Sequence, residues 1–241
     1  MRNPLSPLAS QVDKPRNVLG ERDQAHCIIV HTTGRGIVDQ AAKHGVDPLE
    51  HAIAYYLTPN VGFAHYLVGW AGEIVQIASE AEPAWQAGWK SWERAAYFDG
   101  SWRTKWASDY ENRVVGVNEN HYGWWTTRWR STSPQHITKD IVPYGAEHTP
   151  NSVGIGIECL WHVGGLTDTQ YTALARLCVD VSKRRQFPLY APPCARMLGH
   201  EDLCPCRRTD KKGRPWDPGS QLNWNRLWAR ILSITPMRRP R

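Results

Sequence analysis

The segment Val153-Gly154-Ile155-Gly156-Ile157-Glu158-Cys159-Leu160 carries the strongest strand signal in the chain. It is a short apolar run rich in isoleucine, which is typical of a buried strand. Its one charged residue, Glu158, interrupts that run, and a buried carboxylate without a partner costs several kcal/mol. We therefore expect Glu158 to face a cleft, a cation or a metal-bound water. A structural ion pair with an arginine is the alternative.

Strands and helices alternate on both sides of this segment. A strand over 25–32 and a hairpin over 63–77 precede it. A capping box at 47–50 predicts a helix as far as Leu57, and a second capping box at 167–170 begins a helix that ends in basic residues. A last helix follows near the C-terminus, over about 220–232. This interleaving predicts an α/β domain with its site residues at strand ends.

The composition indicates how the chain is divided. Its 241 residues, 41% of them hydrophobic, predict one domain with a long insertion. We expect an arm over 1–24, a domain over 25–232 and a basic tail over 233–241. Tryptophans scattered among charged residues mark the insertion at about 89–149. A loop of this length is usually functional, which favours an aromatic wall beside the active site. A subdomain with its own small core is the alternative.

The net charge of +6 bears on partners and location. It favours an anionic partner such as nucleic acid, anionic lipid or bacterial cell wall, although solubility alone explains it equally well. The tail is expected to make at most a weak contact with anionic membrane or wall polymer. No segment resembles a signal peptide or a membrane span, so we expect synthesis in the cytoplasm without a leader.

A candidate metal site lies in the segment Gly199–Asp210. Turn-forming residues after His200 allow His200 and Asp210 to face one ion, with Arg208 beside them. A zinc site needs a further ligand, and the best donor is His31, which follows the apolar run 27–30 at the end of a strand. The cysteines do not form a dense disulfide framework, but Cys194 paired with Cys204 or Cys206 stays possible.

The ordered series of motifs resembles the zinc N-acetylmuramoyl-L-alanine amidases. That superfamily includes phage lysins, muropeptide-recycling amidases and peptidoglycan recognition proteins. The similarity covers roughly residues 25–88 and 150–232. The motifs that carry it are His31-Thr32-Thr33, Ala64-His65-Tyr66-Leu67, Gly72-Glu73-Ile74-Val75-Gln76, Ala84-Trp85-Gln86-Ala87-Gly88, Asn151–Glu158 and Gly199-His200-Glu201-Asp202 through Asp210.

The resemblance implies a central mixed β-sheet flanked by helices and a catalytic zinc ion held by His31, His200 and Asp210. The reaction is hydrolysis of the amide between N-acetylmuramic acid and L-alanine in bacterial peptidoglycan. Glu158 would act as the general base and acid, and Arg208 stands where relatives carry lysine, so it would stabilise the oxyanion. Cys204 or Cys206 in place of Asp210 is an alternative for the third ligand.

The resemblance also implies substrate contacts at Trp85, Gln86 and His65. Many relatives have histidine where this chain has Gln86. Lysin relatives have a catalytic tyrosine where this chain has Ala64, which favours the glutamate-dependent mechanism. For His65, packing, a supporting hydrogen bond and direct metal binding all stay open.

We interpret the sequence as a monomeric zinc hydrolase that acts on peptidoglycan or muropeptides. An endolysin-type lytic enzyme, released by holin-type lysis or by injection, agrees best with the basic charge and the missing leader. A cytoplasmic muropeptide-recycling amidase and a non-catalytic peptidoglycan-binding receptor are the alternatives. Nucleic-acid binding, suggested by charge and aromatic content alone, is not expected.

Overall fold

The computed structural model describes residues 6–16, 25, 27–86, 150–187, 189, 197–200 and 217–235. The predicted insertion at about 89–149 lies outside these residues, as does most of the predicted basic tail. Within the part that is described, no helix combines the length and apolar character needed to cross a bilayer.

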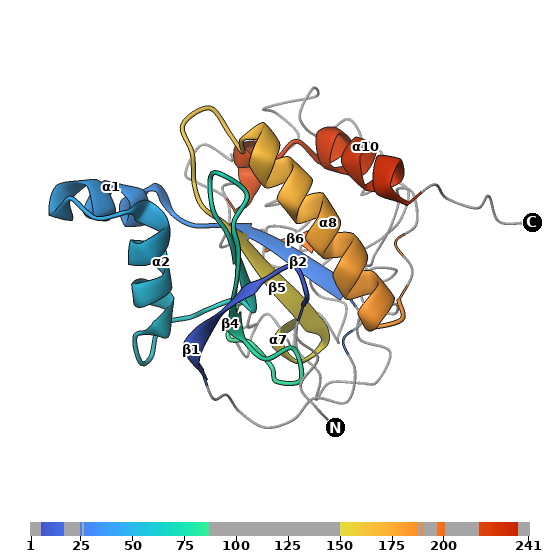
Figure 1. Ribbon diagram of the computed structural model, residues 1–241, viewed down its shortest axis with the longest axis horizontal. Helices are drawn as coiled ribbons and strands as arrows, with labels where there is room; N and C mark the ends of the chain where they lie inside the picture. The colour runs from blue at the N-terminus through green and yellow to red at the C-terminus, as the bar shows by residue number, and fades with distance from the viewer. Residues whose placement is uncertain are drawn as a thin grey trace, which may run out of the picture.

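A six-stranded sheet forms the centre of the described structure, in the order β1-β4-β3-β5-β2-β6 (Figure 1). Only the β3–β4 pair is antiparallel, so the sheet is mixed, as predicted. The strands are β1 (Ser10–Arg16), β2 (Cys27–Thr32), β3 (Tyr66–Val68), β4 (Ile74–Ala78), β5 (Gly154–Cys159) and β6 (Met197–Gly199). β1 lies in the segment predicted to be a separate arm, but it pairs with β4 as an edge strand of the sheet.

Two long helices cover one face of the sheet. α8 (Asp168–Arg184) begins at the predicted capping box, in which the Thr167 side chain accepts from the Gln170 backbone N–H and the Gln170 side chain accepts in return. α10 (Trp224–Ile234) is capped by Asn223 and packs against α8. Figure 1 shows α8 in front of the strands and α10 beside α8. Their apolar stripes and this face of the sheet form the larger core cluster.

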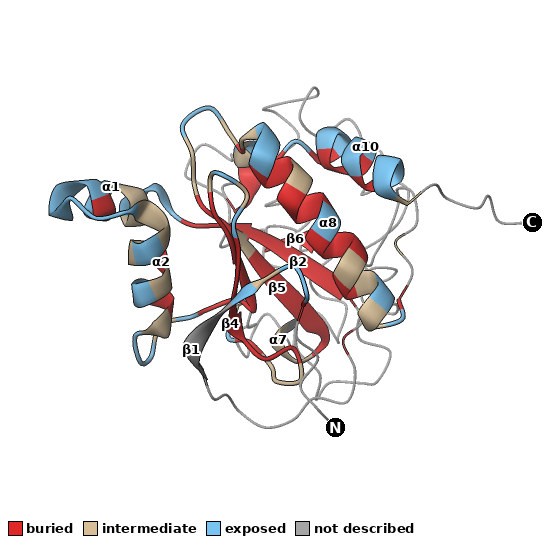
Figure 2. Cartoon of the chain, in the orientation of Figure 1, coloured by how far each residue is buried: buried red, intermediate tan, exposed pale blue. Residues whose placement is uncertain are grey.

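A pair of shorter helices packs near the other face. α1 (Arg35–His44) follows Gly34, which provides no side-chain cap, and this helix was not predicted from the sequence. α2 (Pro48–Leu57) is the predicted helix, and the Asp47 carboxylate accepts from the Leu49 and Glu50 backbone N–H groups. α1 and α2 project to one side of the sheet, and much of their surface is exposed (Figures 1 and 2). We call this pair the helical arm.

The alternation of side chains along the strands separates two cores. On β3, Tyr66 and Val68 belong to the cluster with α8, whereas Leu67 belongs to the cluster with α2. On β5, Ile155 and Ile157 likewise pack into the larger core. Glu158 is therefore on the opposite face, which is the face toward the helical arm.

A buried charged network joins the end of β4 to the end of α8. Glu80 is fully buried and accepts from Arg184 at 2.7 and 2.8 Å and from Arg185 at 2.6 Å. The Tyr66 hydroxyl also donates to it. Burial would raise the pKa of Glu80, but the hydrogen bonds from Arg184 and Tyr66 and the arginine charges outweigh it. The pKa of Glu80 is therefore below its ordinary value.

Candidate metal centre and active-site cleft

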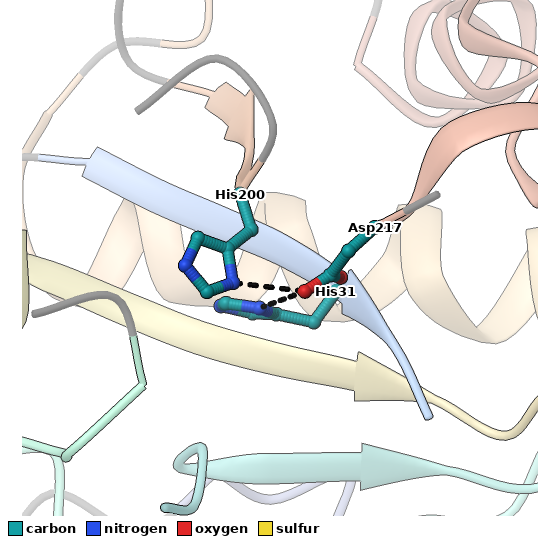
Figure 3. Close-up of side chains that lie close together, drawn as sticks. All are labelled: His31, His200 and Asp217. Atoms are coloured by element: carbon teal, nitrogen blue, oxygen red, sulfur yellow. Dashed lines mark hydrogen bonds and ion pairs between the residues drawn. The ribbon is translucent and has the colours of Figure 1, made fainter. Parts of the chain in front are cut away.

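Three side chains from distant parts of the sequence meet at one edge of the sheet. His31 lies in β2, His200 directly follows β6, and Asp217 lies in the turn before the short helix η1 (Gly219–Gln221). All three are buried, and their potential ligand atoms lie within 4.8 Å of one another. Figure 3 shows both imidazole rings turned toward the carboxylate. The distances to Asp217 Oδ2 are 2.8 Å from His200 Nδ1 and 3.6 Å from His31 Nδ1.

Strand register explains why the two histidines meet. β2 and β6 are parallel neighbours, with Val30 opposite Gly199. The residue after Val30 is His31 and the residue after Gly199 is His200, so the two imidazoles lie side by side, with ring centroids 4.7 Å apart.

The Asp217 carboxylate is held on both of its oxygens. Oδ1 accepts from the Thr32 backbone N–H at 3.1 Å, and Oδ2 faces the two histidines. Burial would raise the pKa of Asp217, but the charge of His31 and the hydrogen bonds from His200 and His31 hold it far below its ordinary range. The site therefore keeps Asp217 as an anion.

These residues fit a catalytic zinc ion. Two imidazoles and one carboxylate are a common donor set for zinc, and three protein ligands leave one coordination position for water or substrate. Among the described residues, His31, His200 and Asp217 are the cluster of His, Cys, Asp or Glu side chains that lie close enough together to hold a metal ion. We expect one Zn²⁺ held by His31, His200 and Asp217.

Glu158 lies next to this centre. It pairs in register with His31 on the neighbouring strand, so both side chains are on one face, and both line the same cleft. The Tyr56 hydroxyl reaches Glu158 from α2 and donates a hydrogen bond to its carboxylate. Burial raises the pKa of Tyr56 well above its ordinary value, and the negative charges of Glu158 and Asp217 raise it further.

The cleft has a volume of about 590 Å³ and extends from the metal centre to the helical arm. Trp85 and Gln86 line it. The substrate contacts that the family resemblance implies for them stay predictions. The Gln86 side chain lies over β5, where its Nε2 donates to the Gly154 carbonyl at 2.8 Å. It fits there only because Gly156 has no side chain, since a Cβ on Gly156 would lie 1.5 Å from Gln86 Oε1.

The comparison with known families decides the identity of the chain. Residues 21–220 match the Amidase_2 family, which is described as N-acetylmuramoyl-L-alanine amidase. The chain belongs to the N-acetylmuramoyl-L-alanine amidase family. Its buried His-His-Asp set is the metal site expected of such an amidase. No sequence among the curated proteins matches the chain.

The chain is similar to several solved structures, and the first of them shows the same fold. The crystal structure of a selenomethionine AmpD derivative is 21% identical, with a TM-score of 0.51 over 93% of this amidase and 95% of the AmpD chain. The solution structure of Citrobacter freundii AmpD is 20% identical, with a TM-score of 0.45 over 97% and 96%. AmpDh3 from Pseudomonas aeruginosa, in complex with anhydromuramic pentapeptide, is 16% identical, with a TM-score of 0.44 over 92% and 66%.

The predicted metal ligands have different outcomes in this amidase. The structure brings His31 and His200 together. The carboxylate it places beside them is Asp217, which the sequence analysis did not propose. Asp210 and Arg208 lie outside the described residues, as do Cys204 and Cys206, so the roles predicted for them stay predictions.

Asp217 is 17 residues after His200, and it begins the turn Asp217-Pro218-Gly219 before the last helix. This turn sequence was the signal from which Asp217 could have been proposed as a site residue. A turn of this kind next to a helix gives its carboxylate a definite position.

Of the roles left open for His65, the structure shows packing and supporting hydrogen bonds, and it gives no support to the substrate contact. Its side chain is fully buried, and it is not among the residues that line the cleft. Nδ1 accepts from the Gly156 backbone N–H at 2.9 Å, so the proton is on Nε2, which donates to the Glu82 carbonyl at 2.9 Å. These bonds tie β3 to β5 beneath the cleft.

Proposed function

We propose that this chain hydrolyses the amide bond between the lactyl group of N-acetylmuramic acid and L-alanine in bacterial peptidoglycan, and that it does so as a lytic, endolysin-type enzyme. The observation that carries the reaction is the buried His31, His200 and Asp217 set with Glu158 beside it in one open cleft. A general base next to a three-ligand metal site is the arrangement that metal-assisted hydrolysis requires.

The roles of the residues follow from their positions. Glu158, as a carboxylate, takes a proton from the attacking water while the new C–O bond forms. It then passes that proton to the leaving amine of L-alanine as the C–N bond breaks. Tyr56 holds the carboxylate through its hydroxyl. When bound, Zn²⁺ would polarise the scissile carbonyl and favour deprotonation of the water. Arg208 is proposed to stabilise the oxyanion, as the family resemblance implies.

The lytic role is supported by the net charge of +6, which favours contact with an anionic cell wall. A lytic enzyme must accept cross-linked, insoluble peptidoglycan, whereas a recycling enzyme takes soluble muropeptides in the cytoplasm. A receptor would bind the same polymer without cleaving it. We propose that the protein reaches the wall after release by holin-type lysis or by injection.

The test is digestion of intact sacculi and of soluble muropeptides by the zinc-loaded full chain, with new ends identified by mass spectrometry. The expected products from both are stem peptides with a free L-alanine amine, absent with Glu158→Gln and with His200→Ala. Cleavage of soluble muropeptides alone would favour the recycling role. Sacculi that retain the zinc-loaded protein without any cleavage would instead favour the receptor.

A further inference from the structure

Two histidines of the helical arm lie close together, away from the metal centre. His44 is the last residue of α1, and His51 lies near the start of α2. Their ring centroids are 6.4 Å apart, and their ring planes differ by 29°. His44 is exposed and His51 is half-buried, and neither imidazole has a hydrogen-bond or ion-pair partner among the residues that the structure describes. In the neutral form, each ring therefore offers a nitrogen lone pair to a ligand.

The connection between α1 and α2 fixes where the two side chains begin. Gly45 ends α1 with a φ of 66°, and its N–H donates to the Ala41 and Ala42 carbonyls. The Asp47 carboxylate then caps α2. Since the helices are joined by 45–47 alone and both helix ends are capped, little backbone entropy is left to lose when an ion bridges the two rings.

The separation of the two rings agrees with a shared metal ion. A metal–nitrogen bond of about 2.0–2.1 Å places the centroid of an imidazole about 3.2 Å from the ion. Two rings on one ion are then about 5.2 Å apart at the tetrahedral angle and about 6.4 Å apart on opposite sides of the ion. The observed 6.4 Å is at the upper end of that range. Rotation about χ2, a broad torsion in histidine, turns the nitrogens toward the ion, and the exposed His44 is free to move closer.

The surroundings of the pair favour a cation. His44 lies at the C-terminal end of α1, where the last backbone carbonyls carry partial negative charge. Asp47 and Glu50 are acidic, and Lys43 is the basic residue between 43 and 51. Imidazole nitrogen suits Zn²⁺, Ni²⁺ and Cu²⁺, whereas Mg²⁺ and Ca²⁺ take oxygen ligands. The pair is therefore matched to a divalent transition-metal ion.

The position of the pair connects it to the active-site cleft. His51 lines the cleft together with Gln40 and Tyr55. Gln40 is four residues before His44 on α1, and Tyr55 is four residues after His51 on α2, so each pair shares a helix face. An ion held by the two histidines would bring its charge and its bound waters to the end of the cleft that lies at the helical arm.

We propose that His44 and His51 form a second, weaker site for a divalent transition-metal ion such as Zn²⁺, and that an ion bound there slows the entry of substrate into the cleft. Two imidazoles without a carboxylate bind more weakly than the three ligands of the metal centre, so the second site fills only when zinc exceeds one equivalent. The site itself is independent of the proposed amidase reaction, whereas the slower entry rests on it.

The binding test titrates Zn²⁺ by calorimetry into the full chain that already holds one equivalent. The wild type is expected to bind a second ion, and His44→Gln or His51→Gln should weaken that step at least about tenfold while the first equivalent stays bound. His162→Gln is the matched control and should change neither step, because His162 lies outside the cleft lining with Nδ1 3.2 Å from the Gly165 carbonyl oxygen. Equal second-step affinities in the wild type and in both variants would overturn the site.

Two further readouts identify the ligands and the effect. In ¹⁵N NMR of the histidine side chains, the second equivalent should shift the His44 and His51 nitrogens, and shifts confined to other histidines would contradict the assignment. Turnover of a soluble muropeptide should fall as the second ion binds to the wild type, but not in His44→Gln. Unchanged turnover at full occupancy would overturn the slower entry. Absence of turnover with one equivalent would instead contradict the amidase proposal, and the titration and NMR would still decide the second site.

Discussion

Asp217 is the residue whose role depends most on the tertiary structure. The His200 and His31 side chains flank its carboxylate, and the Thr32 backbone N–H holds its other oxygen. When both histidines are neutral, a buried carboxylate in that position has no opposite charge beside it unless it binds a metal ion. This favours Asp217 as a metal ligand. The competing aspartate, Asp210, is assigned by the turn-forming sequence after His200 and by family resemblance, so metal binding separates the two.

Asp217→Asn is expected to lose stoichiometric zinc, because the amide replaces an anionic ligand with a neutral one. The loss of zinc affinity should exceed the roughly 10–100-fold that follows removal of groups supporting a ligand. Measurement of bound zinc after dialysis checks this, with Asp210→Asn as the matched control that keeps its metal. If Asp217→Asn keeps its zinc and Asp210→Asn loses it, Asp210 is the third ligand instead.

Tyr56→Phe tests whether the hydroxyl orients the general base. The carboxylate of Glu158 stays in the variant but loses the donor that holds it, so kcat should fall about tenfold with KM unchanged. In a Glu158→Gln background the same substitution should cost nothing further, because the oriented carboxylate is already gone. Additive losses in the double variant would mean that Tyr56 acts through general stability.

At the scale of elements, β5 performs two tasks through the period of its side chains. Ile155 and Ile157 pack into the core beneath α8, while Gly154, Gly156 and Glu158 alternate with them toward the cleft. Gly156 leaves room for the Gln86 side chain, the Gly154 carbonyl accepts from it, and Glu158 is the next residue of β5 on the same face. The strand therefore builds both the core and the floor of the active site.

Gly156→Ala is expected to destabilise the fold by about 1–3 kcal/mol, because the new Cβ would lie 1.5 Å from Gln86 Oε1 and 3.1 Å from Ala64 Cβ. Denaturant unfolding monitored by circular dichroism measures the change. The double variant Gly156→Ala with Gln86→Ala should recover much of the loss, since the closest clash is then absent. No recovery in the double variant would place the strain in the backbone or against Ala64.

At the scale of the whole molecule, the network around Glu80 joins segments that are far apart in the sequence. Arg184 is 104 residues from Glu80 and lies in the last turn of α8, whereas Glu80 follows β4. Because the carboxylate is fully buried, removing its charge takes an ion-pair partner from both Arg184 and Arg185, although Arg184 keeps its pair with Asp180. The network therefore ties the hairpin half of the sheet to the helix that covers it.

Glu80→Gln is expected to lower the free energy of unfolding near pH 7 by about 3–5 kcal/mol. The pKa of Glu80 is lower in the folded chain than its ordinary value of 4.5. Its contribution is thus present above that value and is lost as the pH falls through the folded pKa. The wild-type and variant unfolding free energies, from urea titrations between about pH 3 and 7, should converge in acid. A constant difference would mean that Glu80 does not titrate in this range.

Much of the architecture followed from local patterns. The apolar run before His31 and the segment Val153–Leu160 became β2 and β5, and the Thr167 capping box began α8, because strand alternation and caps depend on near neighbours. α1 was missed since Gly34 provides no capping side chain. β1 was missed because its segment has no clear apolar pattern. It forms a strand through its pairing with β4 at the edge of the sheet, which is a tertiary contact.

The sequence by itself determined the α/β class and the family, and it predicted His31, His200 and Glu158 as site residues, which the structure places in one cleft, because ordered motifs and strand ends are local properties. Only the tertiary structure decided that Asp217 reaches the histidines, that Tyr56 holds Glu158, that His65 is buried, and that Tyr55 joins Trp85 in the cleft. These contacts link segments far apart in the chain, and their distances depend on strand register and helix packing, which no short stretch of sequence specifies.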